Sequence, residues 1–193
     1  AICNLRNSNP IITNVLIVDN ESGAYGGGIY SASHSSSPCS PIVTNTTFSN
    51  NHADSSGGGG YDDGLGSTKL RNSILSGNTS PGDDDIDAPP AMAITALSHV
   101  IIGTDYYVSG LTPPTTVSST IFIDPLQGDY ELVNGSPAIN VGDSTYFNTG
   151  KTPDLSSFAT DIRYAKRTMG INIDLGAYEV CSDTSILQLT ISE

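Results

Sequence analysis

The chain contains an internal repeat, and a repeat of this length restricts the fold to a few classes. The segment Pro10 to Tyr30 reads PIITNVLIVDNESGAYGGGIY, and the segment Pro41 to Tyr61 reads PIVTNTTFSNNHADSSGGGGY. Equivalent residues of these two copies, such as Asn14 and Asn45, are 31 residues apart, and a less regular third copy places Asn72 a further 27 residues on. Repeats of a few tens of residues indicate a solenoid, a propeller or an array.

The contents of the repeat favour a β-solenoid. Each copy has short alternating runs of β-branched and apolar residues, which are typical of strands, and no stretch has the sustained period of a helix. Asn14, Asn45 and Asn72 recur at one place, and Asn tolerates the left-handed conformation that a bend requires. Glycines 26–28 and 57–60 supply the second bend. We therefore predict an all-β fold, a right-handed parallel β-helix of about four coils with an irregular C-terminal β cap.

The repeat also predicts how the chain is divided. Residues 1–123 should form the coils, and residues 124–193, where the period is lost, should form a C-terminal capping or anchor-associated segment on one continuous core. A cap is expected because the end coil of a solenoid presents unpaired backbone groups. The first residues, Ala1 to Leu5, are similar to the Gly-Ile-Tyr part of the repeat. We therefore expect the chain to begin within a repeat, truncated at its N-terminal side.

The repeats resemble those of pectin-lyase-like β-helix proteins of bacterial surfaces, on Asn-Pro-x-Ile-x-Asn, on residues 48–53 and on Gly-Gly-Gly-Ile-Tyr. The C-terminal half is similar to the choice-of-anchor Q domain, which is common in surface and secreted proteins of Bacteroidetes and their relatives. The residues that carry this second resemblance are Asp124-Pro125, Gly128-Asp129-Tyr130, Gly135-Ser136-Pro137-Ala138-Ile139-Asn140, Gly142-Asp143, Asp161, Arg167, Gly170 and Ile173-Asp174-Leu175-Gly176-Ala177-Tyr178-Glu179. Together the two resemblances cover residues 10–180 and imply a secreted or cell-surface module.

The net charge of the chain limits the partners that it can bind. The formal net charge of −13 argues against nucleic acid and against insertion into an anionic membrane, because both would repel the chain. No apolar run is long enough to cross a membrane as a helix. We expect a monomer.

The chain has three cysteines, Cys3, Cys39 and Cys181, an odd number without metal-ligand spacing. This predicts free buried thiols, with a Cys3 to Cys39 disulfide as the alternative.

One group of residues is a candidate for catalysis. Asp62 and Asp63 precede Lys69 and Arg71, which alternate on one predicted strand and therefore share a face. Polysaccharide lyases need a base beside a carboxylate and a divalent ion that stabilises the developing anion. The alternative, which we favour, is a solvated outer face of a strand. The hydrolases of the resembled fold carry further motifs that are absent here.

Two acidic groups have separate interpretations. Asp83, Asp84, Asp85 and Asp87 offer hard oxygen ligands of the kind that calcium selects, on an insertion (residues 80–90) that we expect to project from the stack. Calcium is therefore a possible cofactor, although the spacing of a known calcium loop is missing. The second group belongs to the choice-of-anchor resemblance, and we interpret it as structural ion pairs and turn caps rather than as chemistry. Its members are Asp143, Asp161, Arg167 and Asp174.

Two classes of function follow. The first is a non-catalytic, adhesin-like or glycan-facing scaffold, whose partner is a polysaccharide or a glycan of a host or cell surface and whose location is extracellular or on the outer cell surface. The second is a fragment of a polysaccharide lyase or glycoside hydrolase of the pectin-lyase-like fold. A complete set of acid, base and metal ligand on one face would separate them, and the sequence contains no complete set. We favour the first class.

Overall fold

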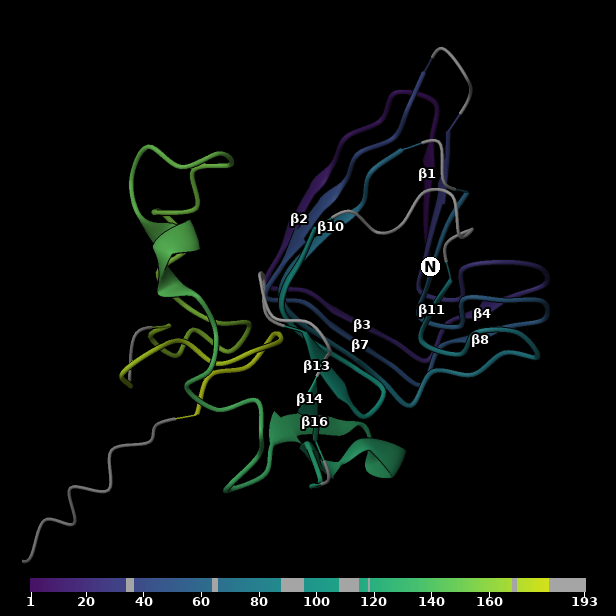
Figure 1. Cartoon of the computed structure of the whole chain (residues 1–193). Helices are drawn as coiled ribbons and strands as arrows, with labels where there is room; N and C mark the ends of the chain where they lie inside the picture. The colour runs from purple at the N-terminus through teal and green to yellow at the C-terminus, as the bar shows by residue number, and fades with distance from the viewer. Residues whose placement is uncertain are drawn as a thin grey trace, which may run out of the picture.

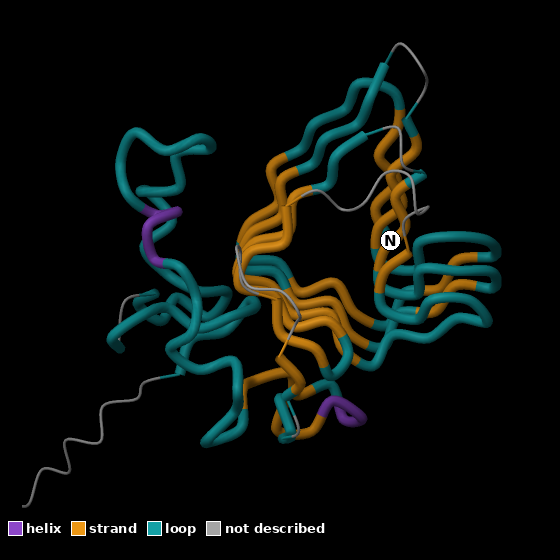
Figure 2. The backbone as a smooth tube through the Cα atoms, viewed as in Figure 1, coloured by secondary structure: helices purple, strands orange, loops and turns teal. Residues whose placement is uncertain are grey.

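The computed structural model describes residues 1–33, 37–63, 66–87, 96–107, 115–117, 119–167 and 170–180. They form a parallel β-helix whose coils lie flat on one another (Figures 1 and 2). One wall is a parallel sheet in the order β1 (Ile2–Leu5), β5 (Ile29–Ala32), β9 (Gly60–Asp62) and β11 (Ile86–Asp87). Neighbours in this sheet are one coil apart, so the described chain makes about three turns. The predicted fold class is confirmed, with fewer turns than the four expected.

The other walls repeat the same stacking. A second wall contains β2 (Ile11–Thr13), β6 (Ile42–Thr44), β10 (Lys69–Ser76) and β12 (Ala96–Ile102). Where the chain bends, β3 (Leu16–Val18) pairs with β7 (Thr47–Ser49), and β7 pairs with the second half of β10. At the far corner β4 (Glu21–Ser22) pairs with β8 (His52–Ala53). Every one of these pairings is parallel, because each strand meets its equivalent in the next coil.

The register explains the two repeat lengths in the sequence. Ile2 pairs with Ile29, and Lys69 pairs with both Ile42 and Ala96, so these coils are 27 residues long. The coil from Ile11 to Ile42 is 31 residues long. The longer coil contains the polar stretch between β5 and β6. A loop at a corner lengthens a coil without disturbing the strands, because it leaves the stack and returns to the same register.

Left-handed residues make the bends between the walls. Asn14, Asn45 and Asn72 have φ angles of 57°, 47° and 47° and occupy one position in successive coils. His99 has a φ of 55° and takes this position in the following coil, since Ser98 pairs with Arg71. Asn adopts this conformation at low cost because its side chain bonds locally. The repeated asparagine is therefore a backbone requirement of each coil.

The buried apolar side chains form two clusters. One fills the inside of the coils with inward-facing residues of each wall: Ile12, Ile17, Ile29, Val43, Phe48, Leu70, Leu75 and Val100. The other lies on the outer face of the second wall, where Ile74 and Ile101 point away from the first cluster and meet residues from the segment after β12. The members contributed by that segment are Ile121, Phe122, Tyr130, Leu132, Ala138 and Leu175.

Antiparallel strands end the stack. β13 (Asp105–Tyr107) turns back along β12, and β14 (Thr115–Thr116) pairs with β13. Next come β15 (Phe122–Asp124), the short 3-10 helix η1 (Pro125–Gln127), β16 (Asp129–Leu132), which pairs with β15, and the 3-10 helix η2 (Ser144–Phe147). The reversal at β13 covers one edge of the last coil, so the backbone groups of β12 find partners there.

From the sequence we expected the segment after residue 124 to cover the end of the stack, but its described residues, 125–167 and 170–180, are placed differently. It lies along the side of the coils (Figure 1). The amide nitrogen of Asn14 donates to the carbonyl of Thr160 at 2.8 Å, that of Asn45 to the carbonyl of Asp174 at 2.9 Å, and that of Asn72 to the carbonyl of Asp143 at 3.0 Å. Three coils are thus held by one segment. The reason is that the asparagine bend leaves side-chain amides facing outward, and this segment supplies their acceptors.

No helix in the described part of the chain is long and apolar enough to cross a membrane.

The boundary that the sequence predicts between residues 123 and 124 falls inside β15. The division of the chain into coils (residues 1–123) and a C-terminal segment (residues 124–193) on one continuous core stays a prediction.

Candidate functional site

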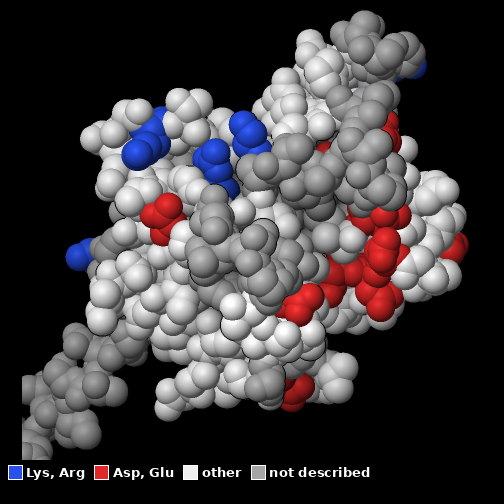
Figure 3. Space-filling view, in the orientation of Figure 1, with Lys and Arg blue, Asp and Glu red and all other residues white. Residues whose placement is uncertain are grey.

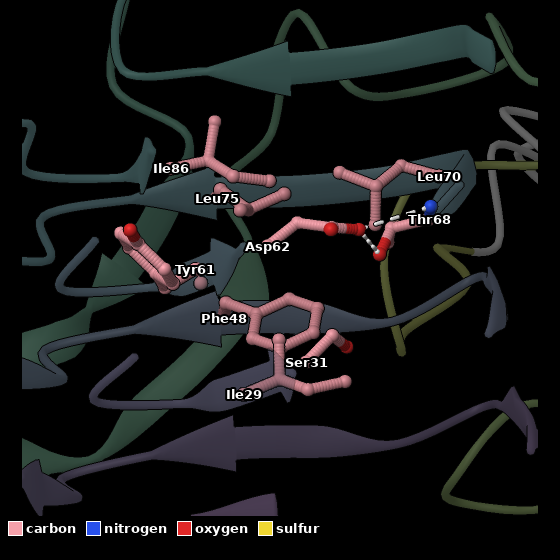
Figure 4. Close-up of a pocket in the computed structure, with 10 residues that line it drawn as sticks. Ile29, Ser31, Phe48, Tyr61, Asp62, Thr68, Leu70, Leu75 and Ile86 are labelled. Carbon is pink, nitrogen blue, oxygen red and sulfur yellow. Dashed lines mark hydrogen bonds between the residues drawn. The ribbon is translucent and has the colours of Figure 1, made fainter. Parts of the chain in front are cut away.

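Asp62 faces the inside of the coil. It is 4% exposed and lies on β9, next to a small cavity of about 10 Å³ lined by apolar side chains such as Phe48 and Leu70 (Figure 4). Its carboxylate accepts hydrogen bonds from the backbone nitrogen of Thr68, at 3.2 Å, and from the Thr68 hydroxyl. A cavity of this size holds about one water molecule. Asp62 therefore fixes the loop that leads into β10 and has no access to a substrate.

Arg71 and Lys69 lie on the outside of the same wall. The residue between them, Leu70, is buried in the coil, so both basic side chains point outward, as the alternation predicts. The guanidinium of Arg71 lies 4.6 Å from the centroid of the Tyr146 ring and donates to the carbonyl of Thr152 at 3.4 Å. Arg71 and Asp62 are thus on opposite faces of the shell, and the catalytic candidates do not converge. The remaining candidate, Asp63, continues β9, where its backbone nitrogen donates to Ser31.

The acidic run at residues 83–85 lies in the stack rather than projecting from it. The backbone carbonyls of Asp83, Asp84 and Asp85 accept hydrogen bonds from Gly57, Gly59 and Gly60 at 2.7, 3.0 and 2.9 Å. The run therefore continues the glycine corner into the third coil. The expectation of a projecting loop is wrong for this part, because the coil from Lys69 to Ala96 keeps the 27-residue length and so has no extra residues to form a loop.

The four candidate calcium ligands have different surroundings. Asp84 accepts from the backbone of Ser80, Asp85 accepts from Asn78, and Asp87 pairs in register with Tyr61. Among the described residues, no three His, Cys, Asp or Glu side chains are grouped so that they could hold a metal ion. The arrangement offers no ready cage for calcium, and calcium binding stays an untested expectation.

A ladder of side-chain amides runs along the axis inside the coils. Asn20 donates through its backbone and side-chain nitrogens to Oδ1 of Asn51 at 3.1 and 2.9 Å. Asn51 donates in the same way to Asn78 at 3.0 and 2.8 Å, and Asn78 to Asp85 at 3.2 and 2.7 Å. Asn20 and Asn51 each give two hydrogen bonds to the next coil, and Asn78 gives two to Asp85, seven residues further along its own coil, which accepts only and is the last member. Burial raises the pKa of Asp85, and the bonds from Asn78 oppose that rise.

A second polar network joins the C-terminal segment to the first coil. Arg167 is 1% exposed and donates through Nε and Nη2 to Oδ1 of Asn14 at 3.1 and 2.8 Å. It also donates to the carbonyls of Gly176 and Ala177 at 3.0 Å each and lies 3.4 Å from Oε2 of Glu179. A guanidinium has five N–H donors in a planar fork and can serve all these acceptors at once.

Three buried carboxylates, Asp161, Asp174 and Glu179, surround this arginine, and the two aspartates hold backbone turns in place. Asp161 accepts from the backbone nitrogens of Arg163 and Ala165, both at 2.8 Å, and from that of Glu179 at 2.9 Å. Asp174 accepts from the backbones of Asn140 and Val180, both at 2.7 Å. These contacts hold a structure in place and leave no carboxylate exposed for chemistry. Nearer the surface, Asp143 accepts from the backbone of Thr145 at the start of η2.

Burial shifts the titration of the charged groups in this network. It raises the pKa of Glu179 to about 8, because the loss of solvation and the neighbouring Asp174 outweigh the attraction of Arg167. It also raises the pKa of Asp174 and lowers that of Arg167. Within the described part of the chain, Oε1 of Glu179 has no hydrogen-bond partner. Glu179 ends the motif that carries the choice-of-anchor resemblance, but the sequence predicts no role for it, since a single glutamate at the end of such a run carries no spacing signal.

Cys3 and Cys39, the two cysteines in the described part of the chain, are not bonded to each other. Cys39 is buried and free, and Cys3 is free but exposed on β1. The expectation of free thiols holds for these two residues, and the expectation of burial is wrong for Cys3, whose side chain faces outward between its inward neighbours. Cys181 lies outside the described residues.

The fold and the amide ladder define a class: a parallel β-helix of stacked repeats. One family pattern matches the chain, the Chlamydia polymorphic membrane protein (Chlamydia_PMP) repeat, over residues 45–62. The matched residues run from the Asn45 bend through β7, β8 and the glycine corner to β9. No curated protein matches the chain, and no solved structure matches it.

Proposed function

We propose that this chain is part of a secreted or cell-surface protein in which the β-helix is a non-catalytic, adhesin-like scaffold that faces a glycan. The observation that carries the proposal is the separation of Asp62 and Arg71 by the wall of the coil. An acid or base must reach the scissile bond, and a partner must meet the charge that develops. Here the carboxylate is enclosed and the guanidinium lies outside on Tyr146.

The matched repeat supports the location. It is named for polymorphic membrane proteins, and a stacked solenoid offers the long, rigid side walls that surface recognition uses. The acidic surface (net charge −13) favours solubility and disfavours nucleic acid. We propose a monomer with an extracellular or outer-surface location.

The experiment is an assay for cleavage. Purified protein is incubated with polygalacturonate, xylan and laminarin, with and without calcium, and the products are analysed for unsaturated ends and new reducing ends. We expect neither product. Cleavage that disappears in Lys69→Ala or Arg71→Ala would overturn the proposal in favour of a polysaccharide lyase or glycoside hydrolase. Size-exclusion chromatography with light scattering checks that the protein is a monomer.

A further inference from the structure

Three tyrosine rings meet on the outer face of the first wall. Tyr30 and Tyr61 are paired in register on β5 and β9, and their ring centroids are 5.8 Å apart at an interplanar angle of 29°. Tyr25 comes from the glycine corner, outside the strands of that sheet, and its ring centroid is 4.6 Å from that of Tyr61. Stacking of equivalent residues explains the first pair. It does not explain why a ring from a different position joins them.

The rings form an accessible platform. Tyr25 is 43% exposed, and Tyr30 and Tyr61 are half-buried at their edges. The neighbours of Tyr30 along β5, Ile29 and Ser31, are buried in the coil, so the tyrosine side chains stand on the outer face. Among the described residues, none makes a hydrogen bond to the three phenol oxygens. Part of each ring is therefore open to solvent, that of Tyr25 most of all, while the faces that Tyr30 and Tyr61 turn toward each other are covered.

Carboxylates border the platform. Asp87 pairs in register with Tyr61, and Asp63 follows β9. Burial, and then the negative charge of Asp63, raises the pKa of Tyr30, and burial followed by Asp87 raises that of Tyr61. Most of the acidic side chains visible in Figure 3 gather on this side of the coils, and most of the lysines and arginines lie on the opposite side. The field at the rings is therefore negative.

We propose that Tyr25, Tyr30 and Tyr61, with Asp63 and Asp87, form a binding site for a neutral polysaccharide. The C–H face of a pyranose ring carries partial positive charge and packs on the negative face of an aromatic ring. The carboxylates accept hydrogen bonds from sugar hydroxyls, and charge-assisted bonds of this kind are strong. An acidic polysaccharide would be repelled by the same carboxylates. This inference rests on the proposed glycan-facing role, and it names the site and the class of glycan.

Intrinsic fluorescence gives a direct test, because the chain has nine tyrosines and no tryptophan. Laminarihexaose and cellohexaose are titrated as neutral probes, and hexagalacturonate as the acidic probe, with calorimetry as a second measurement. We expect saturable binding of a neutral probe with a change in tyrosine emission, and no binding of the acidic one. Tyr25→Ala and Tyr61→Ala should each weaken binding by about tenfold, as expected for the loss of one stacking contact.

A matched control separates this site from the rest of the surface. Tyr164 is 87% exposed in the C-terminal segment, so Tyr164→Ala removes an exposed ring away from the platform and should leave binding unchanged. Equal thermal melting of the variants shows that they fold. Neutral binding that survives Tyr25→Ala and Tyr61→Ala would overturn this site while leaving the glycan-facing role intact. Tighter binding of hexagalacturonate would overturn the ligand class, and failure to bind any glycan on an array would overturn the glycan-facing role itself.

Discussion

Arg167 donates two hydrogen bonds to the side-chain oxygen of Asn14, 153 residues away in the sequence. Asn14 in turn donates to the carbonyl of Thr160. The bend at Asn14 is thereby joined to the C-terminal segment. Because Arg167 is buried among Asp161, Asp174 and Glu179, the contact is also the point at which the negative charge of the C-terminal segment is balanced.

The first prediction concerns this contact. Arg167→Lys should lower the free energy of unfolding by about 3 kcal/mol, because one ammonium cannot serve the acceptors of a guanidinium fork and leaves buried carboxylates poorly compensated. Asn14→Gly removes the amide and keeps the left-handed backbone. A double-mutant cycle measured by urea unfolding should give a coupling energy of about 1 to 3 kcal/mol. Additive effects would contradict a direct contribution from the pair.

The repeated asparagines were predictable because each coil needs the same bend. Asn45 and Asn72 occur at matching places, and their side chains meet, with the amide nitrogen of Asn72 3.3 Å from Oδ1 of Asn45. What the pattern could not predict is the other use of these amides, as anchors for the C-terminal segment. Those contacts, such as that between Asn45 and Asp174, join residues 129 apart, and the segment that supplies the acceptors has no period.

The third coil shows a second limit of the sequence pattern. The run Asp83 to Asp85 takes the place of Gly57 to Gly59 in the stack, although the two runs have no residue in common. The equivalence depends on backbone hydrogen bonds, which any residue with the right φ and ψ can make. The repeat did not predict the end of the amide ladder either, because Asp85 accepts from Asn78 within one coil and has no asparagine counterpart in the coil before it. Asp62 and Arg71 lie on opposite faces of the wall because residues along a strand alternate between the inside and the outside of the coil.

The second prediction concerns the ladder. Asn51→Ala removes bonds to Asn20, Asn78 and the carbonyl of Ile17 at once, and leaves buried groups unsatisfied. The free energy of unfolding should fall by about 3 kcal/mol or more. Asn134→Ala is the control, since Asn134 is exposed and should change stability by less than about 0.5 kcal/mol. Equal effects of the two substitutions, measured by urea unfolding, would exclude a structural role for the ladder.

The third prediction concerns close packing at the glycine corner. A Cβ atom on Gly58 would lie 2.5 Å from the carbonyl oxygens of Asp84 and Thr79, whereas one on Gly23 would find its nearest neighbour, the Asp54 side chain, at 3.8 Å. Gly58→Ala should therefore destabilise the chain by about 1 to 3 kcal/mol through overpacking. Gly23→Ala should be neutral or slightly stabilising, because it restricts the unfolded chain. Thermal melting of the two variants decides between a packing effect and a general effect of losing glycine.

The fourth prediction is a dependence of stability on pH that comes from Glu179. Burial raises its pKa from 4.5 to about 8, so the folded chain binds this proton more tightly than the unfolded chain. The contribution is fully present below the unfolded pKa and is lost as the pH rises through the folded one. The free energy of unfolding should therefore fall between about pH 5 and pH 8, by at most about 1.4 kcal/mol per pH unit for this single group.

The measurement is urea unfolding at intervals across that range for the wild-type chain, Glu179→Gln and Glu131→Gln. Glu179→Gln cannot lose a proton, and its profile should be flatter than that of the wild type. Glu131 pairs with Arg163 near the surface, so its substitution should shift the profile without changing its slope. Stability of the wild type that stays level from pH 5 to pH 8 would mean that Arg167 keeps Glu179 ionised in the folded chain, because a carboxylate whose pKa is not raised titrates below this range. The buried pair would then be an ion pair, and the profiles of the wild type and Glu179→Gln would have the same slope across this range.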